Sequence, residues 1–323
     1  MGVGDGRQKI GINGVAGKHC GRISRGTEKS RKVKLCALSE DVGKSAHMEK
    51  SDGELLDSVE RGDDSAIEEL LRRYQSRIYQ FGMKMCGDPE DAKDVVQETL
   101  LAMAQSLGSF RRASSISTWA YTIARSFCIK KRRKSKFAPA EELSLDGTGS
   151  KYLEPVNDPS QQPDRAVSAK ELEAFLNRAI QSLDPMHREV LLLRDVEELS
   201  APEVAEVLGI GVEAVKSRLH RARLAVREQI APLLGVPATS TAAARPGCPD
   251  VLMSFSRHLE GEIDRDTCRS LENHVAQCSN CRKACDSLKK TLALCRDSSS
   301  TSVPLDVQES VRKAIRVFLS SKS

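Results

Sequence analysis

Aromatic residues and long apolar runs are what this chain of 323 residues has least of. Phe, Tyr and Trp make up 4% of the sequence, and charged residues make up 29%. This composition suits small helical domains better than a large β-rich enzyme. No apolar run is long enough to span a bilayer, and the N-terminus lacks the apolar core of a secretory signal. We therefore expect a cytoplasmic protein without a membrane partner.

Recognisable catalytic motifs are also missing. The glycines at Gly11, Gly14 and Gly17 lack the spacing to a Gly-Lys-Ser/Thr that a phosphate loop needs. We find no Ser/His/Asp set and no paired-carboxylate motif, so we expect that the protein is not an enzyme. Ten cysteines are present, and in a cytoplasmic chain metal ligands or thiols are a better expectation than a disulfide framework.

Composition changes along the chain predict several modules. Residues 1–47 are rich in Gly, Lys, Arg and Ser without periodicity, which indicates a disordered basic tail or a mis-assigned translation start. Proline-rich and small polar stretches indicate two flexible linkers. The expected organisation is a helical module at 48–137, a linker at 138–167, a second helical module at 168–235, a linker at 236–246, a small third module at 247–297, and a tail at 298–323 with an amphipathic helix from about Leu305 to Leu319.

The first module combines an acidic helix with a basic one. Asp88 and Pro89 predict the start of a helix over residues 90–107, which carries Asp94 and Glu98 on one face and apolar residues on the other. The formal net charge is only +5, but no acid interrupts the basic residues of 111–136. Such a cluster indicates a polyanionic partner. The lone Trp119 could stack on a base, although at helical spacing it is more often a core residue.

The second module contains a helix-turn-helix pattern. Ser200 and Glu203 have the spacing of a capping box, and Gly209 can supply the left-handed residue of the turn. In the helix that follows, Val212, Val215 and Leu219 share the inner face. The residues predicted to point outward are Lys216, Ser217, Arg218, His220, Arg221 and Arg223. In this motif the second helix enters the major groove of DNA.

The third module has the spacing of a zinc site. His274, Cys278 and Cys281 form H-x3-C-x2-C, and a closed tetrahedral site needs a fourth ligand. Cys248 is the natural candidate, and Cys268, Cys285 and His258 are competitors. A module this small needs a staple, which zinc would supply. The other thiols, at Cys268, Cys285 and Cys295, suggest redox sensing as a further hypothesis.

Residues 50–235 resemble a bacterial sigma factor of the extracytoplasmic-function group. DPEDAKDVVQETLLAMAQSLGSF and STWAYTIARSFCIKKRRKSK are similar to sigma region 2. LDPMHREVLLLRDVEELSAPEVAEVLGIGVEAVKSRLHRAR is similar to region 4, and residues 248–285 resemble the zinc-binding domain of anti-sigma factors. The expected fold is therefore all-α, with a region 2 bundle, a region 4 helix-turn-helix and a small helical zinc module.

The resemblance implies partners for particular residues. Core RNA polymerase would bind through its β′ clamp helices and β flap, the former contacting Asp94, Gln97 and Glu98. The −10 promoter element would be contacted by Arg125, Lys130, Lys131, Arg132, Arg133 and Lys134. The −35 element would be read by Glu213, Ala214, Ser217 and Arg218, with Lys216, Arg221 and Arg223 mostly on phosphates.

Two questions stay open at this stage. A helix-turn-helix regulator that binds DNA without being a polymerase subunit is the alternative function, and the acidic helix argues against it. The zinc module could inhibit or activate the sigma modules, and a separate anti-sigma factor is a further candidate partner.

Overall fold

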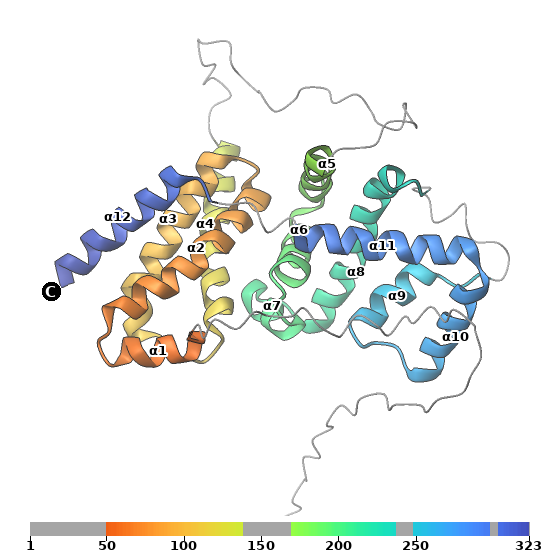
Figure 1. The fold of residues 1–323 in the computed structure, drawn as a ribbon, viewed down its shortest axis with the longest axis horizontal. Coiled ribbons are helices and arrows are strands. Elements are labelled where there is room, and N and C mark those ends of the chain that lie inside the picture. Colours follow the sequence, from red (N-terminus) through yellow and green to blue (C-terminus); the bar gives the residue numbers. More distant parts are fainter. Residues whose placement is uncertain (1–49, 138–168, 237–247, 298–302, 323) are drawn as a thin grey trace, which may run out of the picture.

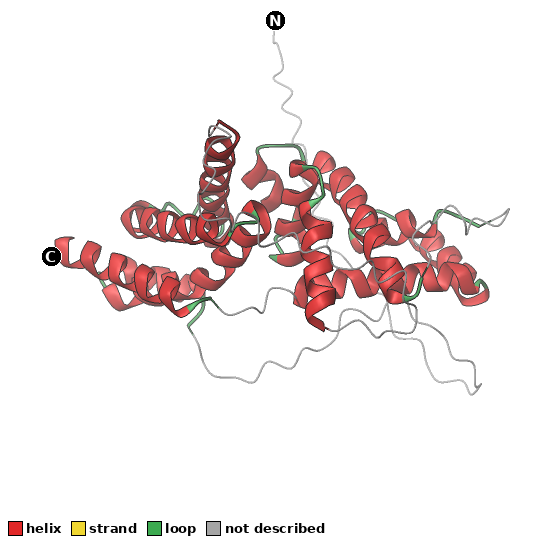
Figure 2. Ribbon diagram, turned by 90° about the horizontal axis from the view of Figure 1, so that it is seen from above, coloured by secondary structure: helices red, strands yellow, loops and turns green. Residues whose placement is uncertain are grey.

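The computed structural model describes residues 50–137, 169–236, 248–297 and 303–322. Within these ranges the chain is helical and contains no strand (Figures 1 and 2), which confirms the predicted all-α fold. The expected basic tail over 1–47 and most of both expected linkers lie outside the described residues. None of the described helices is both long and apolar enough to cross a membrane.

The first group of helices is a bundle around one core. It consists of α1 (Asp52–Glu60), α2 (Asp64–Cys86), α3 (Pro89–Ser106), the short helix η1 (Leu107–Ser109) and α4 (Ile116–Phe137). Asp88 caps α3 and Pro89 occupies its first turn, as predicted. The long helices bury apolar faces that include Leu70, Ile78 and Leu100.

The second group holds the helix-turn-helix. It consists of α5 (Ala169–Gln181), α6 (Pro185–Leu191), the π-helical turn η3 (Leu192–Val196), α7 (Ala201–Leu208), α8 (Val212–Ile230) and η4 (Ala231–Leu234). Helix α6 packs on α8, and α7 packs on α4 of the first bundle. The two groups therefore share one continuous hydrophobic core.

The C-terminal helices pack at two separate places on the rest of the molecule. Helices α9 (Val251–Leu259), α10 (Arg265–Gln277) and α11 (Ser279–Asp297) form a small module with its own core, and α9 and α11 lie against α8. Helix α12 (Leu305–Lys322) lies instead along α3 at the opposite end (Figure 1), with Val307, Val311 and Ile315 in the first bundle's core. The module and α12 thus cover the sigma-like part from two ends.

Candidate nucleic-acid interface and metal centre

The helix-turn-helix forms where its capping signals predicted it. A Glu203 carboxylate oxygen accepts the N–H of Ser200 at 2.9 Å, and the Ser200 hydroxyl accepts the N–H of Glu203, which completes the capping box. Gly209 ends α7 with a φ of 66°, a left-handed conformation that glycine adopts without strain. Val215 and Leu219 are fully buried, so α8 turns its opposite face outward.

The outer face of α8 keeps most of the predicted DNA-contacting residues available. Glu213, Ser217 and Arg221 are exposed, whereas Lys216 and Arg218 are half-buried. Exposed donors on the first turns of such a helix are suited to base edges and phosphates. Their positions are compatible with the DNA contacts that the sequence predicted, and those contacts stay a prediction.

Arg223 and His220 depart from the predicted outward orientation. Only 3% of Arg223 and 5% of His220 is exposed. The Arg223 guanidinium donates to Asp195 at 2.5 and 2.8 Å and to Glu260 at 2.7 Å. Asp195 belongs to the π-helical turn η3, so this arginine joins α8 to two other elements. The expectation that Arg223 points into solvent was wrong, because two carboxylates hold it inside.

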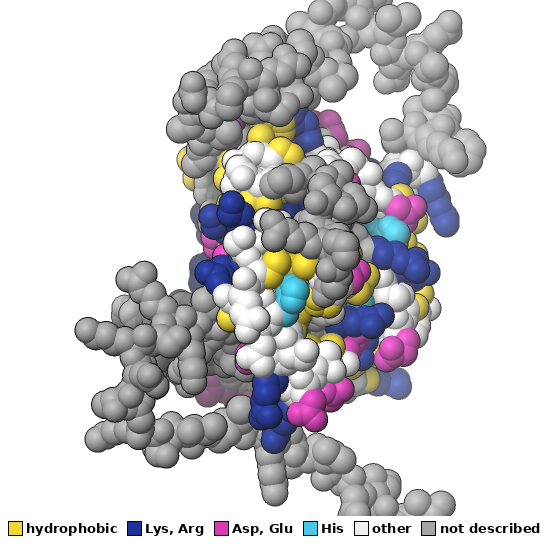
Figure 3. Space-filling view, turned by 90° about the vertical axis from the view of Figure 1, so that its right-hand side faces the viewer, with side chains coloured by type: hydrophobic (Ala, Val, Ile, Leu, Met, Phe, Trp, Pro, Cys, Tyr) yellow, Lys and Arg dark blue, Asp and Glu magenta, His cyan; other side chains and the backbone are white. Residues whose placement is uncertain are grey.

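An acidic loop at residues 260–264, between α9 and α10, supplies the ion pairs of the zinc module with α8. Glu260 pairs with Arg223 and with Arg194, the latter at 3.1 Å. Glu262 lies 2.9 Å from Nε2 of His220 and 3.4 Å from Nζ of Lys216. Figure 3 shows basic and acidic side chains near one another on one face of the molecule. The acidic loop therefore pairs with basic side chains of α8, the second and recognition helix of the helix-turn-helix.

Some basic side chains of helix α4 are exposed, and others are paired with acidic side chains. Lys130 and Arg133 are exposed, and the side chain of Lys134 lies outside the described residues. Arg125 donates to Glu189 of α6 at 2.7 Å, and Arg132 lies 3.4 Å from the same carboxylate, which is 2% exposed. Lys131 instead pairs with Asp94 of α3. Arg125 and Arg132, both predicted to contact DNA, are thus paired with the buried carboxylate of Glu189 in the second group of helices.

A second buried carboxylate strengthens this seam between the two sigma-like groups. Glu197 is 5% exposed and accepts hydrogen bonds from the Tyr121 hydroxyl and from Arg77, the latter at 3.4 Å. Burial raises the pKa of Glu197, while the bonds from Tyr121 and Arg77 favour its charged form. Sequence patterns gave no sign of Glu189 or Glu197, because each acid becomes meaningful only beside its distant partner.

The predicted polymerase-docking residues on α3 lie beside α12. Gln97 donates a hydrogen bond to the Ser310 hydroxyl, and Lys93 pairs with Asp306 at 3.1 Å. Asp94 is half-exposed and bound to Lys131, and Glu98 is also partly exposed. Helix α12 therefore covers part of the face that the sequence assigned to a partner.

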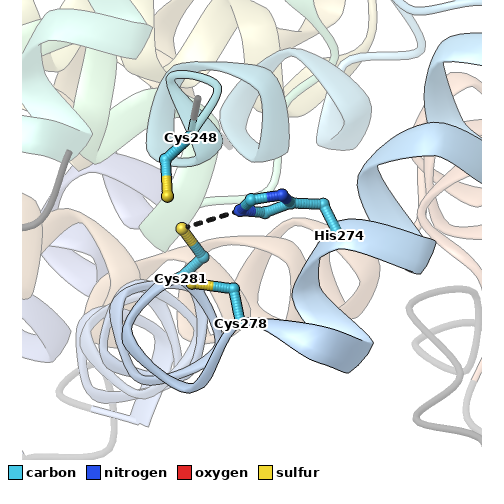
Figure 4. Close-up of side chains that lie close together, drawn as sticks. All are labelled: Cys248, His274, Cys278 and Cys281. Carbon is cyan, nitrogen blue, oxygen red and sulfur yellow. Dashed lines mark hydrogen bonds between the residues drawn. The ribbon is translucent and has the colours of Figure 1, made fainter. Parts of the chain in front are cut away.

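A cluster with the donor set of a zinc site joins the start of the third module to the α10–α11 turn. Ligand atoms of Cys248, His274, Cys278 and Cys281 all lie within 4.8 Å of one another and converge on one point (Figure 4). Nε2 of His274 is 3.2 Å from Sγ of Cys281. Tetrahedral zinc with Zn–S bonds of about 2.3 Å keeps its sulfurs about 4 Å apart, so the donors fit this ion.

Neighbouring thiols shift each other's pKa in this cluster. Hydrogen bonds from the backbone and side chain of Cys281 lower the pKa of Cys278. Burial and the adjacent Cys278 and Cys248 thiols raise the pKa of Cys281 to about 12. Crowded thiols of this kind are stabilised as thiolates when a cation sits among them. The cluster also supports Cys248 over its competitors as fourth donor.

The remaining predicted candidates lie elsewhere. Cys285 and Cys295 have no exposed surface, which gives an oxidant no direct access to them. Cys268 lies 3.6 Å from Nδ1 of His258, outside the cluster. Trp119 is half-buried and its ring centroid is 4.9 Å from that of Phe110, so it packs with the core.

Comparison with known proteins identifies the family of this chain. Family models match residues 70–137 ("Sigma-70 region 2"), 176–226 ("Sigma-70, region 4") and 248–282 ("Putative zinc-finger"). The ECF RNA polymerase sigma factor SigW of Bacillus subtilis is 33% identical over 178 residues, which are 54% of this chain and 94% of the relative. The chain belongs to the ECF RNA polymerase sigma factors. Members of this family direct RNA polymerase to promoters.

A second relative agrees with this membership. The RNA polymerase sigma-H factor of Pseudomonas aeruginosa is 31% identical over 58% of this sigma factor and 97% of its own length. Among solved structures, the sigma factor RpoE of Bartonella quintana, in complex with the anti-sigma factor NepR, matches 50% of this chain and 95% of its own, at 20% identity and a TM-score of 0.37. The family models and the two sigma-factor relatives confirm the resemblance stated from the sequence motifs.

Proposed function

We propose that this sigma factor recruits core RNA polymerase to promoters and that its own C-terminal zinc module holds it in an inhibited, closed form. The observation that carries the proposal is the contact between the acidic loop and the recognition helix. Glu260 lies 2.7 Å from Arg223, and Glu262 lies within reach of His220 and Lys216. Carboxylates at such positions compete with DNA phosphates for the same cations.

In the open form, α8 would read the −35 element. Glu213, Ser217 and Arg218 would face base edges from the start of the helix, while Lys216 and Arg221 would hold phosphates. Because Lys216 already lies 3.4 Å from Glu262, DNA binding requires the acidic loop to move. Release of the loop would therefore increase affinity for the promoter.

Helix α4 would bind the −10 element in the same open form. Its exposed Lys130 and Arg133 are free to meet the backbone, and Arg125 and Arg132 would exchange the Glu189 carboxylate for phosphate. Both partners are anionic acceptors of a guanidinium, so the exchange preserves charge pairing. Opening of the seam between the two sigma regions would accompany promoter binding.

Helix α3 would dock on the clamp helices of the polymerase β′ subunit, and region 4 would contact the β flap. Asp94, Gln97 and Glu98 are the docking residues on α3. The Gln97–Ser310 hydrogen bond and the Lys93–Asp306 pair mean that α12 must leave before a partner helix can bind there. The C-terminal part would thus shield both DNA and polymerase surfaces. A separate anti-sigma factor could act on the same faces.

Zinc would be held by Cys248, His274, Cys278 and Cys281 as a structural ion. When bound, it would cross-link the start of the module to the α10–α11 turn and add folding free energy to a module with a small core. Four protein donors fill a tetrahedral shell and leave no position for an activated water. We infer that the protein is not an enzyme.

Run-off transcription with bacterial core polymerase tests the proposal. The full chain is compared with the Glu260→Gln/Glu262→Gln variant and with a chain that ends at Val236. The two altered proteins should initiate at least about fivefold more than the full chain, the usual size of a coupling between sites. Asp266→Asn, an exposed acid of α10 without a partner on α8, is the matched control and should behave as the full chain.

Other results lead to other functions. If the full chain alone initiates, the module activates rather than inhibits. If no version initiates or binds polymerase but all bind DNA, the protein is a helix-turn-helix regulator that acts without being a polymerase subunit. A polymerase pull-down separates that alternative from an inactive preparation.

A further inference from the structure

A cleft lies between α2 and the C-terminal helix α12, at the opposite end of the molecule from the zinc module (Figure 1). Its volume is about 290 Å³. The lining runs from Ser65 to Gln75 on α2 and from Val311 to Arg316 on α12. Because α12 supplies one wall, the cleft exists only while that helix is docked on the region 2 bundle.

The buried part of the lining is apolar. Leu71 of α2 has no exposed surface, and Val311 and Ile315 of α12 are 3% and 8% exposed. An apolar cavity of roughly 150 Å³ is enough to hold one benzene ring. The cleft therefore has room for a ring-sized apolar body that carries a polar group at each end.

One buried polar atom in the lining has no hydrogen-bond partner. Nε2 of Gln75 is buried and makes no hydrogen bond within the described part of the chain. A buried amide N–H without an acceptor is unfavourable, and an arriving acceptor removes that cost. A ligand with a hydroxyl group at its inner end would supply the acceptor without burying a charge.

The exposed rim of the cleft carries more positive than negative charge. Arg312 and Arg316 lie one turn apart on α12, are exposed, and make no ion pair with any described residue. On the opposite wall Arg72 holds Glu69 at 2.8 Å, so this pair adds no net charge. Glu68 is the remaining acid of the lining and is exposed. Two guanidinium groups against one carboxylate favour a ligand with an anionic group.

We propose that this cleft binds a small hydroxylated aromatic acid. The carboxylate of the ligand pairs with Arg312 and Arg316 at the rim. The ring lies against Leu71 and Ile315, and the hydroxyl oxygen accepts the unpaired N–H of Gln75. A rigid ring is favoured over an aliphatic chain of the same length, because fewer rotatable bonds have to be ordered on binding.

Isothermal titration calorimetry with 4-hydroxybenzoate tests the site itself. The zinc-loaded full chain should bind this probe, and Arg312→Gln/Arg316→Gln should weaken binding at least about tenfold, because charge-assisted hydrogen bonds are lost. Lys313→Gln, an exposed cation of the same helix outside the lining, is the matched control and should bind as the full chain does. Absence of binding, or an unchanged affinity in the double arginine variant, would overturn the proposal.

The inner end of the cleft is tested by combining two ligands with one variant. Benzoate lacks the hydroxyl group and should bind the full chain about fivefold more weakly than 4-hydroxybenzoate does. In Gln75→Leu this difference between the ligands should vanish, because neither ligand then meets an amide donor. A difference that persists in Gln75→Leu would contradict the role given to Gln75.

Ligand binding also favours the docked position of α12, and this step rests on the proposed function, in which α12 shields α3. A ligand that contacts both walls adds its binding free energy to the docked form alone. Saturating 4-hydroxybenzoate should lower the affinity of the full chain for core polymerase by about fivefold, and should leave that of Arg312→Gln/Arg316→Gln unchanged.

The two parts of the inference fail separately. Calorimetric binding of 4-hydroxybenzoate without an effect on polymerase affinity would overturn the coupling to α12 and leave both the site and the proposed function standing. If no version of the chain bound polymerase, the proposed function would fail together with the coupling step, while the calorimetric result would still decide whether the site exists.

Discussion

At the scale of single residues, Arg221 and Arg223 lie two positions apart on α8 in opposite environments. Arg223→Gln should lower the free energy of unfolding by about 3 kcal/mol, because Asp195 and Glu260 lose their buried cation. Exposed Arg221→Gln should leave stability unchanged but reduce the salt dependence of holoenzyme–promoter binding by about one counterion. Urea unfolding and salt titrations measure the two effects. If both variants reduced the salt dependence of promoter binding equally, Arg223 would be a phosphate contact, as the sequence predicted.

Glu203 is a second residue whose contribution to folding stability depends on its surroundings. Burial alone would raise its pKa, but hydrogen bonds from Ser200, Ser115 and Thr118 outweigh burial and hold the pKa below 4.5. A carboxylate whose pKa is depressed in the folded state stabilises the fold at pH values above its unfolded-state pKa. This stabilisation is lost as the pH falls through the folded-state pKa. Glu203→Gln should therefore cost about 1 kcal/mol at pH 7, and less well below pH 4.5.

Urea unfolding at both pH values measures the Glu203 effect. Glu206→Gln, on the exposed side of the same helix, is the matched control and should change stability little at either pH. A cost for Glu203→Gln that does not depend on pH would mean that shape rather than charge sets the contribution of this residue.

At the scale of elements, local signals explain why so many helices could be predicted. Asp88, Ser200 and Gly209 act on their own helix ends, and the sequence alone therefore located α3, α7 and the turn before α8. The H-x3-C-x2-C spacing likewise predicted three members of the Cys/His cluster, His274, Cys278 and Cys281. An amphipathic pattern says that a helix has a buried face but not what buries it. The docking of α12 on α3 and of Glu189 on Arg125 could not be predicted because each joins segments far apart in the chain.

Helix α12 allows a matched test of that docking. Val311 is 3% exposed against the region 2 bundle, whereas Val317 on the same helix is 62% exposed. Val311→Asp should detach α12, because a carboxylate is costly to bury beside apolar residues. The affinity for core polymerase should then rise by about fivefold or more, while Val317→Asp should leave it unchanged. Fluorescence titration of labelled chains with polymerase measures both. Equal affinities, with α12 shown by protease sensitivity to be detached, would exclude it as a shield.

At the scale of the whole molecule, α11 connects the zinc cluster to the core that the sigma regions share. Cys281 lies near its start in the cluster, and Cys295 near its end is fully buried in the shared core. Between them Ser287 accepts a hydrogen bond from Arg227 of α8 at 2.8 Å. A single helix therefore links the candidate metal site to the recognition helix α8 and to the core that the sigma regions share.

This continuity predicts that zinc controls closure. Cys281→Ala should lose zinc, unfold the small module and raise run-off transcription by at least about fivefold. Cys285→Ala removes another buried thiol from the same helix and should keep zinc and the low activity, so the comparison separates metal loss from cavity formation. A chelator should reproduce the effect of Cys281→Ala in the full chain and do nothing to the chain that ends at Val236. If chelation lowered transcription from the full chain instead, zinc would support an activating module, since the acidic loop would then need to stay folded for initiation.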